Sequence, residues 1–322
     1  MGGPPVDRTL VSLLQVNRRM RIAVTGSNGF IGSGICSAAA RAGHSVLGIS
    51  RGSTPVEDFG GEYLQSDVST GDLAKAMAEF RPDAIVHAAG CASVAASMKN
   101  PGEDFKGSVV PWANLLDSIR KSGVRPQIFF TSSAAVYGNS GRQPLSESAP
   151  LSPISSYGFH KQLCEVLARE FSECHGLSVT VLRLFSVFGP RQRRLLVWDI
   201  FRKIRSQPEL VFDGTGEETR DYLSCADVAG AVAQLAGTLR PGGRLRILNL
   251  ARGSSVSIRE MCTTVARLAG CSKPVTFSGA VRAGDPAKWV ADTRQLEKVI
   301  PSWKPMNLDI SLGECLCEWQ TQ

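Results

Sequence analysis

The chain has 322 residues, of which 43% are hydrophobic and 20% are charged, and its net charge is +7. This balance is typical of a globular protein and excludes wholesale disorder, collagen and a continuous coiled coil. The basic residues are scattered, and their densest group, Arg191, Arg193 and Arg194, is too short to form an arm that binds nucleic acid. The excess suits an anionic small molecule such as a phosphate ester, and we expect no nucleic-acid partner.

Cysteine usage and apolar segments bear on the location of the protein. The nine cysteines are odd in number and dispersed, and only four histidines are present. We therefore expect reduced thiols in a cytoplasmic compartment and no metal site. No stretch approaches the ~18 uncharged apolar residues that a membrane helix needs, so we expect no membrane contact. Residues 1–19 make a poor signal peptide and are expected to be a disordered N-terminal extension, with a short docking helix as the alternative.

From Met20 the chain alternates short apolar runs with helical patterns. The expected strands are residues 21–26, 45–50, 62–65, 84–87, 127–131 and 178–183. The expected helices lie near residues 30–42, 72–80, 103–122 and 155–175. This alternation predicts an α/β fold, in which a Rossmann-type doubly wound parallel sheet is covered by helices on both faces and joined by right-handed crossovers.

After about residue 185 the alternation breaks. The later segments are expected to be a loop with a helix, a glycine-rich turn and an amphipathic helix, at residues 191–206, 214–219 and 257–270. A later strand near residues 247–250 is expected to return to the sheet. We therefore expect residues 20–185 to form the dinucleotide-binding domain, and residues 186–322 to form mainly a smaller C-terminal substrate-binding lobe.

The turn after the first expected strand carries three glycines at a spacing of three, Gly26, Gly29 and Gly32. The first permits a tight turn, the second lets the backbone approach a pyrophosphate, and the third lets the helix pack on the strand. Free N–H groups of the helix N-terminus then face the anion. The pattern predicts a dinucleotide site, with a plain glycine-rich turn as the alternative. The expected contacts are Gly26, Ser27, Asn28, Gly29, Phe30, Ile31 and Gly32.

The end of the second expected strand distinguishes NAD from NADP. An acidic residue there would bind the ribose 2′-hydroxyl of NAD(H), but this chain has Ser50 and Arg51. Both can bind a 2′-phosphate, so the sequence favours NADP(H). The alternative is NAD(H), in which case Arg51 is simply a solvated loop residue. Asp67 either accepts a hydrogen bond from the adenine amino group or caps a helix. The cofactor contacts expected after the third and fourth strands are Asp67, Val68, Ala88, Ala89 and Gly90.

Tyr157 and Lys161 lie four residues apart at the start of an expected helix, so they share one face of it. A lysine ammonium beside a phenol favours the phenolate, which can exchange a proton with a substrate hydroxyl or carbonyl. Ser133, at the end of the fifth expected strand, can hydrogen-bond the same substrate oxygen. These three residues predict a proton-transfer unit next to the dinucleotide site.

Several stretches carry a family resemblance: TGSNGFIG, HAAG with VAASMKNP behind it, TSSAAVYG, SYGFHK, RLFSVFGPRQ, GTGEETRDYLSCADV and RAGDPAKWVADT. From Met20 to about Pro305 the chain resembles the extended short-chain dehydrogenase/reductase family of nucleotide-sugar epimerases, dehydratases and ketoreductases. The resemblance implies that Tyr157 is the acid/base, that Lys161 tunes it and binds the cofactor ribose, and that Ser133 polarises the oxygen at C4. It also implies a nucleotide-diphosphate sugar as substrate, with contacts from Ser97, Ser132, Ser133, Ser186, Arg220 and Arg282.

Three departures from the family pattern narrow the range of reactions that we expect of this chain. Ala134 and Ala135 stand where 4,6-dehydratases carry Asp-Glu, which argues against elimination of water. Ser186 stands where the family usually has an asparagine that helps to bind the diphosphate, and residues 108–112 replace its usual Asn-x-x-Gly-Thr run. Three hypotheses remain: a 4-epimerase acting through a 4-keto intermediate, an NADPH-dependent 4-keto-sugar reductase, and a non-catalytic dinucleotide-binding sensor or scaffold.

Relatives in this family form dimers through the helices expected near residues 103–122 and 155–175. By analogy we expect a homodimer. Trp112, Leu115 and Leu116 are candidate members of that interface, and a buried core face explains them equally well.

Overall fold

The computed structural model describes residues 18–57, 59–139, 143–280 and 288–321. Most of the N-terminal extension and Arg282 lie outside these residues. A seven-stranded parallel sheet with the order β11-β6-β5-β4-β1-β2-β3 confirms the predicted fold class. Its strands are β1 (Arg21–Thr25), β2 (Ser45–Ser50), β3 (Glu62–Gln65), β4 (Ala84–His87), β5 (Gln127–Ser133), β6 (Ser178–Leu184) and β11 (Leu245–Leu250).

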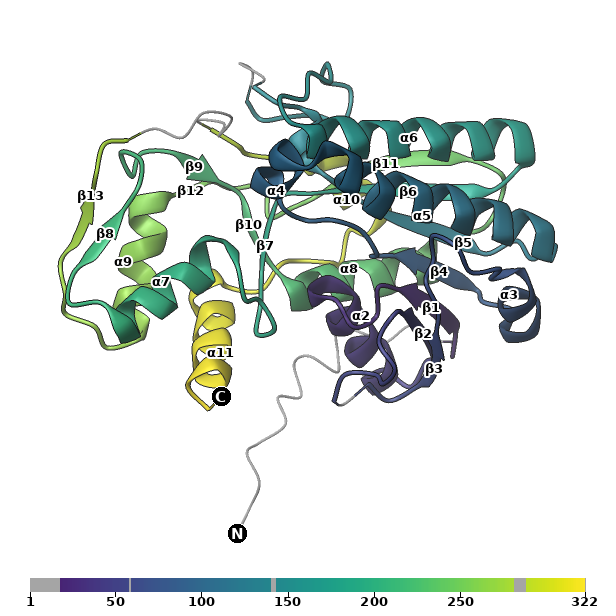
Figure 1. Ribbon diagram of the computed structural model, residues 1–322, viewed down its shortest axis with the longest axis horizontal. Coiled ribbons are helices and arrows are strands. Elements are labelled where there is room, and N and C mark those ends of the chain that lie inside the picture. Colours follow the sequence, from purple (N-terminus) through teal and green to yellow (C-terminus); the bar gives the residue numbers. More distant parts are fainter. Residues whose placement is uncertain (1–17, 58, 140–142, 281–287, 322) are drawn as a thin grey trace, which may run out of the picture.

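Helices cover both faces of the sheet (Figure 1). These are α2 (Phe30–Arg41), α3 (Ala74–Phe80), α5 (Pro101–Ser122), α6 (Ser156–His175), α8 (Cys225–Thr238) and α10 (Arg294–Val299), and the short helix α4 (Val94–Lys99) packs on α5 and α6. Successive strand residues point to opposite faces. Val24 and Val86 therefore pack with α2 and α8, whereas Ala23 and Ile85 pack with α3, α5 and α6. Burial on both faces explains why the strands appear in the sequence as short apolar runs.

The C-terminal part builds a second apolar cluster away from the sheet, at the left of Figure 1. Its elements are α7 (Leu195–Ser206), α9 (Ile258–Leu268) and α11 (Leu308–Gln320), with the parallel pair β8 (Leu210–Phe212) and β13 (Val275–Phe277). Short strands link it to the sheet: β7 (Ser186–Phe188), β9 (Thr219–Arg220), β10 (Tyr222–Ser224) and β12 (Val256–Ser257). The cleft described below lies between this cluster and the sheet.

Helix α8 has no counterpart among the expected elements, although it comes from the C-terminal part of the chain. It packs against α2 and the sheet through Val228, Val232 and Leu235. Alanine and valine are buried around most of its circumference, which removes the 3.6-residue alternation that marks an amphipathic helix. The parallel sheet thus takes two covering helices, α8 and α10, and one edge strand, β11, from beyond residue 185.

Trp112, Leu115 and Leu116 lie in the interior rather than at a surface. All three are fully buried between α5 and the sheet, and the Trp112 indole donates a hydrogen bond to the carbonyl of Cys164 on α6. Of the two interpretations that the sequence leaves open, the structure supports the core face.

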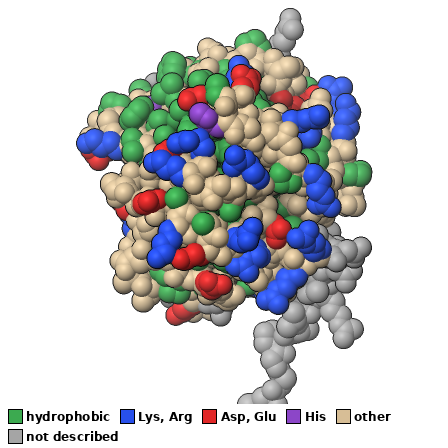
Figure 2. Space-filling view, turned by 90° about the vertical axis from the view of Figure 1, so that its right-hand side faces the viewer, with side chains coloured by type: hydrophobic (Ala, Val, Ile, Leu, Met, Phe, Trp, Pro, Cys, Tyr) green, Lys and Arg blue, Asp and Glu red, His purple; other side chains and the backbone are tan. Residues whose placement is uncertain are grey.

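Charged side chains are spread over the surface. Figure 2 shows the end of the molecule at the right of Figure 1, where Lys and Arg are separated by Asp, Glu and uncharged side chains. Within the described ranges, no helix combines the length and apolarity needed to cross a bilayer. The same residues contain no group of three or more His, Cys, Asp or Glu side chains that could hold a metal ion.

His87 ends β4 as a fully buried imidazole. Its Nδ1 lies 2.7 Å from the Thr25 hydroxyl, and its ring centroid lies 5.0 Å from that of Trp112. The Nε2 atom has no hydrogen-bond partner among the described residues. Burial, assisted by the positive charge of Lys161, lowers the pKa of His87 to about 3. The folded protein therefore holds this side chain neutral.

This histidine predicts a loss of stability in mild acid. Because its pKa is about 3 in the folded chain and 6.5 ordinarily, the unfolded state binds one more proton between these values. The free energy of unfolding should fall as the pH drops below 6.5, by about 1.4 kcal/mol per pH unit from this group. Urea titrations from pH 7 to pH 5 should show a shallower dependence for His87→Gln than for the wild type. The exposed control His175→Gln should follow the wild type, and equal slopes for all three proteins would contradict the assignment.

Candidate active site

A cleft of about 1150 Å³ opens at the carboxyl ends of the strands. Strand β1 lies between β4 and β2, so the chain order reverses beside it. Doubly wound sheets bind ligands at such a switch point. The cleft is lined on the sheet side by residues 88–92 after β4, 131–133 of β5 and 184–187 at the end of β6 and the start of β7. On the other side it is lined by α7, β9 and the turn before β9.

The glycine turn between β1 and α2 is tightly built. Gly26 has φ +72°, and a Cβ there would lie 2.6 Å from the backbone nitrogen of Ala89. A Cβ on Gly32 would lie 2.2 Å from the carbonyl oxygen of Gly26. Both positions therefore require glycine, one for its conformation and both for close backbone approach. The sequence prediction of a glycine-dependent turn agrees with this geometry.

The start of α2 leaves polar groups available to a ligand. Gly29 is its N-cap, with no side-chain cap and no acidic residue in the first turn. The Ser27 hydroxyl and the Asn28 Oδ1 are buried without a hydrogen-bond partner among the described residues. Unpartnered polar atoms beside free helical N–H groups fit a pyrophosphate, which accepts several hydrogen bonds. The turn thus fits a dinucleotide on its own geometry.

Residues expected at the adenosine end lie at the ends of β2 and β3. Ser50 is half-buried and Arg51 is exposed. The Asp67 carboxylate accepts hydrogen bonds from the backbone N–H and hydroxyl of Ser69, at 2.8 and 2.6 Å. These bonds hold the pKa of Asp67 below its usual value, with a smaller contribution from the charge of Arg51. Asp67 therefore remains ionised and stabilises its own turn, while Val68 beside it is buried.

The predicted proton-transfer residues line the same cleft. Tyr157 lies in the first turn of α6 and Ser133 at the end of β5. The Lys161 ammonium is buried, donates to the carbonyl of Thr131 at 2.8 Å, and lies 5.7 Å from the centre of the Tyr157 ring. Ala88, Ala89 and Gly90, which follow the neighbouring strand β4, line the same cleft. The structure therefore brings the phenol, the ammonium and the hydroxyl together beside the glycine turn.

Two serines predicted to bind substrate make structural bonds. Ser97 on α4 is buried, and its hydroxyl accepts the backbone N–H of Tyr157 at 3.0 Å. It thereby satisfies one of the free N–H groups at the start of α6, and it is not among the residues that line the cleft within the described chain. The Ser132 hydroxyl donates to Glu165 at 2.6 Å. Ser186, in contrast, lies half-buried in the cleft wall.

Arg220 lies on β9 in the opposite wall of the cleft. Its guanidinium is 5.6 Å from the Trp289 ring and donates to the carbonyl of Thr219. The neighbouring Asp221 is fully buried and accepts the backbone N–H groups of Arg252 and Gly253 at 2.8 and 2.9 Å. Burial raises the pKa of Asp221 to about 6 although these hydrogen bonds oppose the change. Asp221 thus anchors the strand that presents Arg220.

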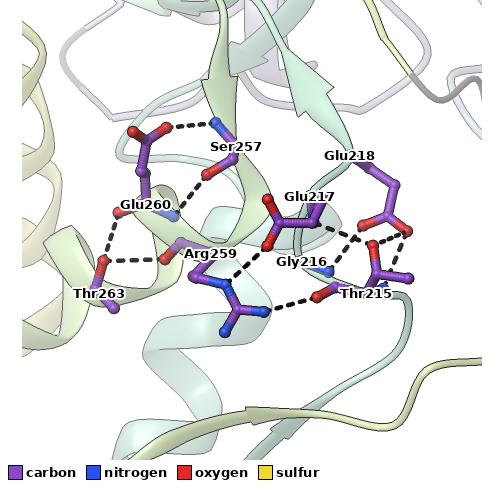
Figure 3. A network of polar contacts seen from close by, with 8 residues as sticks. All are labelled: Thr215, Gly216, Glu217, Glu218, Ser257, Arg259, Glu260 and Thr263. Carbon is purple, nitrogen blue, oxygen red and sulfur yellow. Dashed lines mark hydrogen bonds and ion pairs between the residues drawn. The ribbon is translucent and has the colours of Figure 1, made fainter.

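A polar network braces the turn before Arg220 (Figure 3). The Glu218 carboxylate accepts the backbone N–H groups of Thr215 and Gly216, both at 3.0 Å. Burial acts in the opposite direction, but these hydrogen bonds hold the pKa of Glu218 below its usual value. Arg259 of α9 binds the Glu217 carboxylate at 3.1 Å and the Thr215 carbonyl at 2.8 Å. The wall is therefore held to α9 rather than left as a free loop.

Other cleft residues were not singled out as site residues from the sequence. They include Cys91, Gln192, Arg193, Arg194, Trp198 and Lys288. The only sequence signal was the dense basic group that includes Arg193 and Arg194. Their place in the cleft depends on how α7 packs on the second apolar cluster, which no local pattern specifies.

Comparison with known proteins identifies the family. A family model described as the NAD dependent epimerase/dehydratase family matches residues 22–251, well over half of the chain. The chain belongs to this family. The match begins at β1 and ends just after β11, so it spans the whole parallel sheet. Membership in the NAD dependent epimerase/dehydratase family agrees with the resemblance that the sequence motifs carry.

Three relatives illustrate the similarity. A UDP-glucose 4-epimerase from Mycolicibacterium smegmatis is 30% identical over 299 residues, covering 89% of this chain and 94% of that protein. The solved UDP-N-acetylglucosamine 4-epimerase from Methanobrevibacter ruminantium M1, in complex with UDP-N-acetylmuramic acid, is 27% identical with a TM-score of 0.85. It covers 95% of this chain and 99% of its own. MoeE5 in complex with UDP-glucuronic acid and NAD is 27% identical with a TM-score of 0.84, covering 94% and 99%.

Proposed function

We propose that the protein is an NAD(P)-dependent nucleotide-sugar 4-epimerase. The observation that carries the proposal is the grouping of Ser133, Tyr157 and Lys161 in one cleft with Ala88 and Ala89, against which the glycine turn packs. Two of the similar proteins named above are 4-epimerases of UDP-linked sugars, which supports the same reaction here. Ala134 and Ala135, both buried after Ser133, offer no acid or base for a dehydratase step.

In the proposed reaction the Tyr157 phenolate removes the proton of the C4 hydroxyl, and Ser133 donates a hydrogen bond to the same oxygen. A nicotinamide dinucleotide held beside these residues would accept the C4 hydride and later return it. After the 4-keto sugar has turned in the cleft, Tyr157 returns the proton to the oxygen. Lys161, whose ammonium lies 5.7 Å from the centre of the Tyr157 ring, is assigned to bind the cofactor ribose.

We assign the remaining substrate contacts to residues in the walls of the cleft. Arg220 and Ser186 lie where they can bind the diphosphate of the nucleotide sugar, and Arg282 is assigned the same role by its motif. The cofactor contacts remain those expected from the glycine turn and the ends of the strands. We retain the division into a dinucleotide-binding part, residues 20–185 with α8 and β11, and a mainly sugar-nucleotide-binding lobe formed by the rest of 186–322.

The test combines the identity of the cofactor with turnover. The purified protein is denatured and any released dinucleotide is identified by mass spectrometry. The native protein is incubated with UDP-glucose, UDP-N-acetylglucosamine or UDP-glucuronic acid without added cofactor, and the C4 epimers are quantified by NMR. A retained dinucleotide and formation of an epimer support the proposal. An empty protein that oxidises NADPH only with 4-keto sugar nucleotides would make it a reductase, and binding without turnover would make it a sensor.

We further propose that the cofactor is NADP(H) rather than NAD(H). The end of β2 carries Ser50 and an exposed Arg51, which suit a 2′-phosphate. MoeE5 was solved with NAD, so this preference would distinguish the present chain. Arg51→Ala should weaken NADP binding by about 10- to 100-fold, because a charge-assisted pair is lost, and leave NAD binding unchanged. Calorimetry measures both constants, with Arg41→Ala as a control. Tighter binding of NAD than NADP by the wild type would contradict the proposal.

A homodimer in the cytoplasm completes the proposal. Phe105 on α5 and Phe159, Leu163 and Val166 on α6 are exposed by 39 to 58%, and the two helices lie side by side (Figure 1). An apolar patch of this kind is typical of an interface. Light scattering should give the mass of a dimer for the wild type and of a monomer for Leu163→Lys. A wild-type monomer at micromolar concentration would exclude the proposed homodimer.

The nine free cysteines, all among the described residues, support the proposed cytoplasmic location, because thiols stay reduced there.

A further inference from the structure

Helix α6 carries a third polar residue on the face that holds the proton-transfer residues. Tyr157, Lys161 and Glu165 are spaced by four, so they follow one another along one side of the helix. The first two line the cleft, whereas Glu165 lies deeper and is only 6% exposed. A carboxylate is costly to bury unless it is paired and hydrogen-bonded. The partners of Glu165 therefore indicate what it does.

Those partners lie on the two strands beneath the helix. The Ser132 hydroxyl donates to Glu165 Oε1 at 2.6 Å. Arg183 on β6 donates from Nε to Oε1 at 3.1 Å and from Nη2 to Oε2 at 2.7 Å. Such a two-pronged pair constrains direction as well as distance. Because Ser132 immediately precedes Ser133, the carboxylate joins α6 directly to the end of β5.

The far side of the guanidinium holds the segment after Ser133. Arg183 Nη1 donates to the Tyr137 hydroxyl at 2.9 Å, and this hydroxyl donates to Asn249 Oδ1 at 2.6 Å. Tyr137 follows the short 3₁₀ turn η1 (Ala134–Val136). Burial tends to lower the pKa of Arg183, but the hydrogen bonds and charge of Glu165 raise it overall, so the guanidinium stays charged. The end of β5 is thus fixed on both sides by buried charged bonds.

We propose that Glu165 is a positioning residue whose carboxylate, through Ser132 and Arg183, sets the separation between the Tyr157 phenol and the Ser133 hydroxyl. It touches neither substrate nor cofactor. The proposal rests on the function proposed above, since only a shared substrate oxygen makes that separation matter. A misplacement of about 1 Å in such a pair costs on the order of 100-fold in rate. The network therefore acts on the chemical step rather than on binding.

Two variants loosen the network at different points. Ser132→Ala removes the bond to β5 and leaves the ion pair intact, and Glu165→Gln keeps the shape and removes the charge. Each should lower kcat by about 10- to 100-fold, with the KM for the sugar nucleotide and the dinucleotide Kd changed by less than about threefold. Ser132→Thr retains a hydroxyl and should restore most of the wild-type kcat. A rise in KM with unchanged kcat would overturn the proposal.

Cys164→Ala supplies the matched control. Cys164 is the neighbour of Glu165 on α6, is fully buried, and contacts the carbonyl of Ser108 through its sulfur rather than the network. It should lose stability comparably to Ser132→Ala, as judged by urea unfolding, and keep its kcat. Equal kcat values for Cys164→Ala and Ser132→Ala would reduce the role of the network to general stability and overturn the proposal.

Hydrogen exchange separates this proposal from the proposed function. Amide exchange in residues 131–137 and 156–162 should quicken in Ser132→Ala and Glu165→Gln relative to the wild type and to Cys164→Ala. If the wild type turns over no sugar nucleotide but the exchange pattern is as expected, the proposed function is wrong and the bracing role stands. If the wild type is active and exchange in these segments is unchanged in both variants, the positioning role is wrong.

Discussion

Tyr157→Phe should lower kcat for C4 epimerisation by about 10²- to 10⁴-fold, the usual range for the loss of a general acid–base group. The substitution removes a single hydroxyl from the cleft and keeps the ring beside Lys161. The KM for the nucleotide sugar and the Kd of the dinucleotide should therefore change little. The measurement is the initial rate of epimer formation, followed by NMR at saturating substrate.

The control for this variant is Phe159→Leu, on the same helical turn but exposed away from the cleft. It should keep wild-type turnover and stability. Turnover of Tyr157→Phe within about threefold of the wild type would show that another group moves the proton at C4. A variant that had instead lost its bound dinucleotide would point to a binding role for the phenol.

Gly32→Ala should abolish measurable dinucleotide binding and destabilise the fold. The added Cβ would lie 2.2 Å from the Gly26 carbonyl oxygen, which is backbone and cannot rotate away. Either α2 moves off the turn or the turn opens, and both outcomes displace the N–H groups that would face the pyrophosphate. Overpacking of this kind costs about 1–3 kcal/mol. Calorimetric titration with dinucleotide and urea unfolding measure the two effects.

Gly102→Ala is the matched control, because Gly102 is also helical but a Cβ added there would meet no described atom within 4 Å outside its own helical turn. Alanine favours a helix over glycine by up to about 1 kcal/mol, so this variant should be as stable as the wild type or more so. Its dinucleotide affinity should not change. Wild-type affinity in Gly32→Ala would mean that the glycine turn is a structural feature and that the dinucleotide is held elsewhere.

The sheet and the glycine turn were predictable because their signals are local. Three strands, β2, β3 and β4, have the expected boundaries. In β2 and β4 a short apolar run ends at a polar residue, and in β3 Tyr63 and Leu64 stand between two polar residues. The turn at Gly26 could be predicted because its backbone conformation requires glycine, which is visible in the sequence. Helix α8 escaped prediction because its burial on most sides removes the amphipathic pattern on which such assignments depend.

The candidate site was predictable only where a motif places chemistry at a fixed spacing. Tyr157 and Lys161 share a helix face by their spacing alone, and the structure places them in the cleft. The bond of Ser97 depends on α4 meeting α6, and that of Ser132 on α6 meeting β5. A serine that binds a ligand and one that braces a helix therefore look alike in sequence. Glu165 and Arg183 are 18 residues apart and pair only after α6 and β6 have packed.

The placement of α8 and β11 has a consequence for how the chain is made. The apolar face formed by Val24, Ile35 and their neighbours is covered in part by Val228, Val232 and Leu248. When only the first 185 residues have left the ribosome, one face of the sheet is therefore partly exposed and strand β6 has an unpaired edge. Such surfaces attract other chains at cellular concentrations. We therefore expect a fragment that ends at residue 185 to expose apolar surface that later segments of the full chain cover.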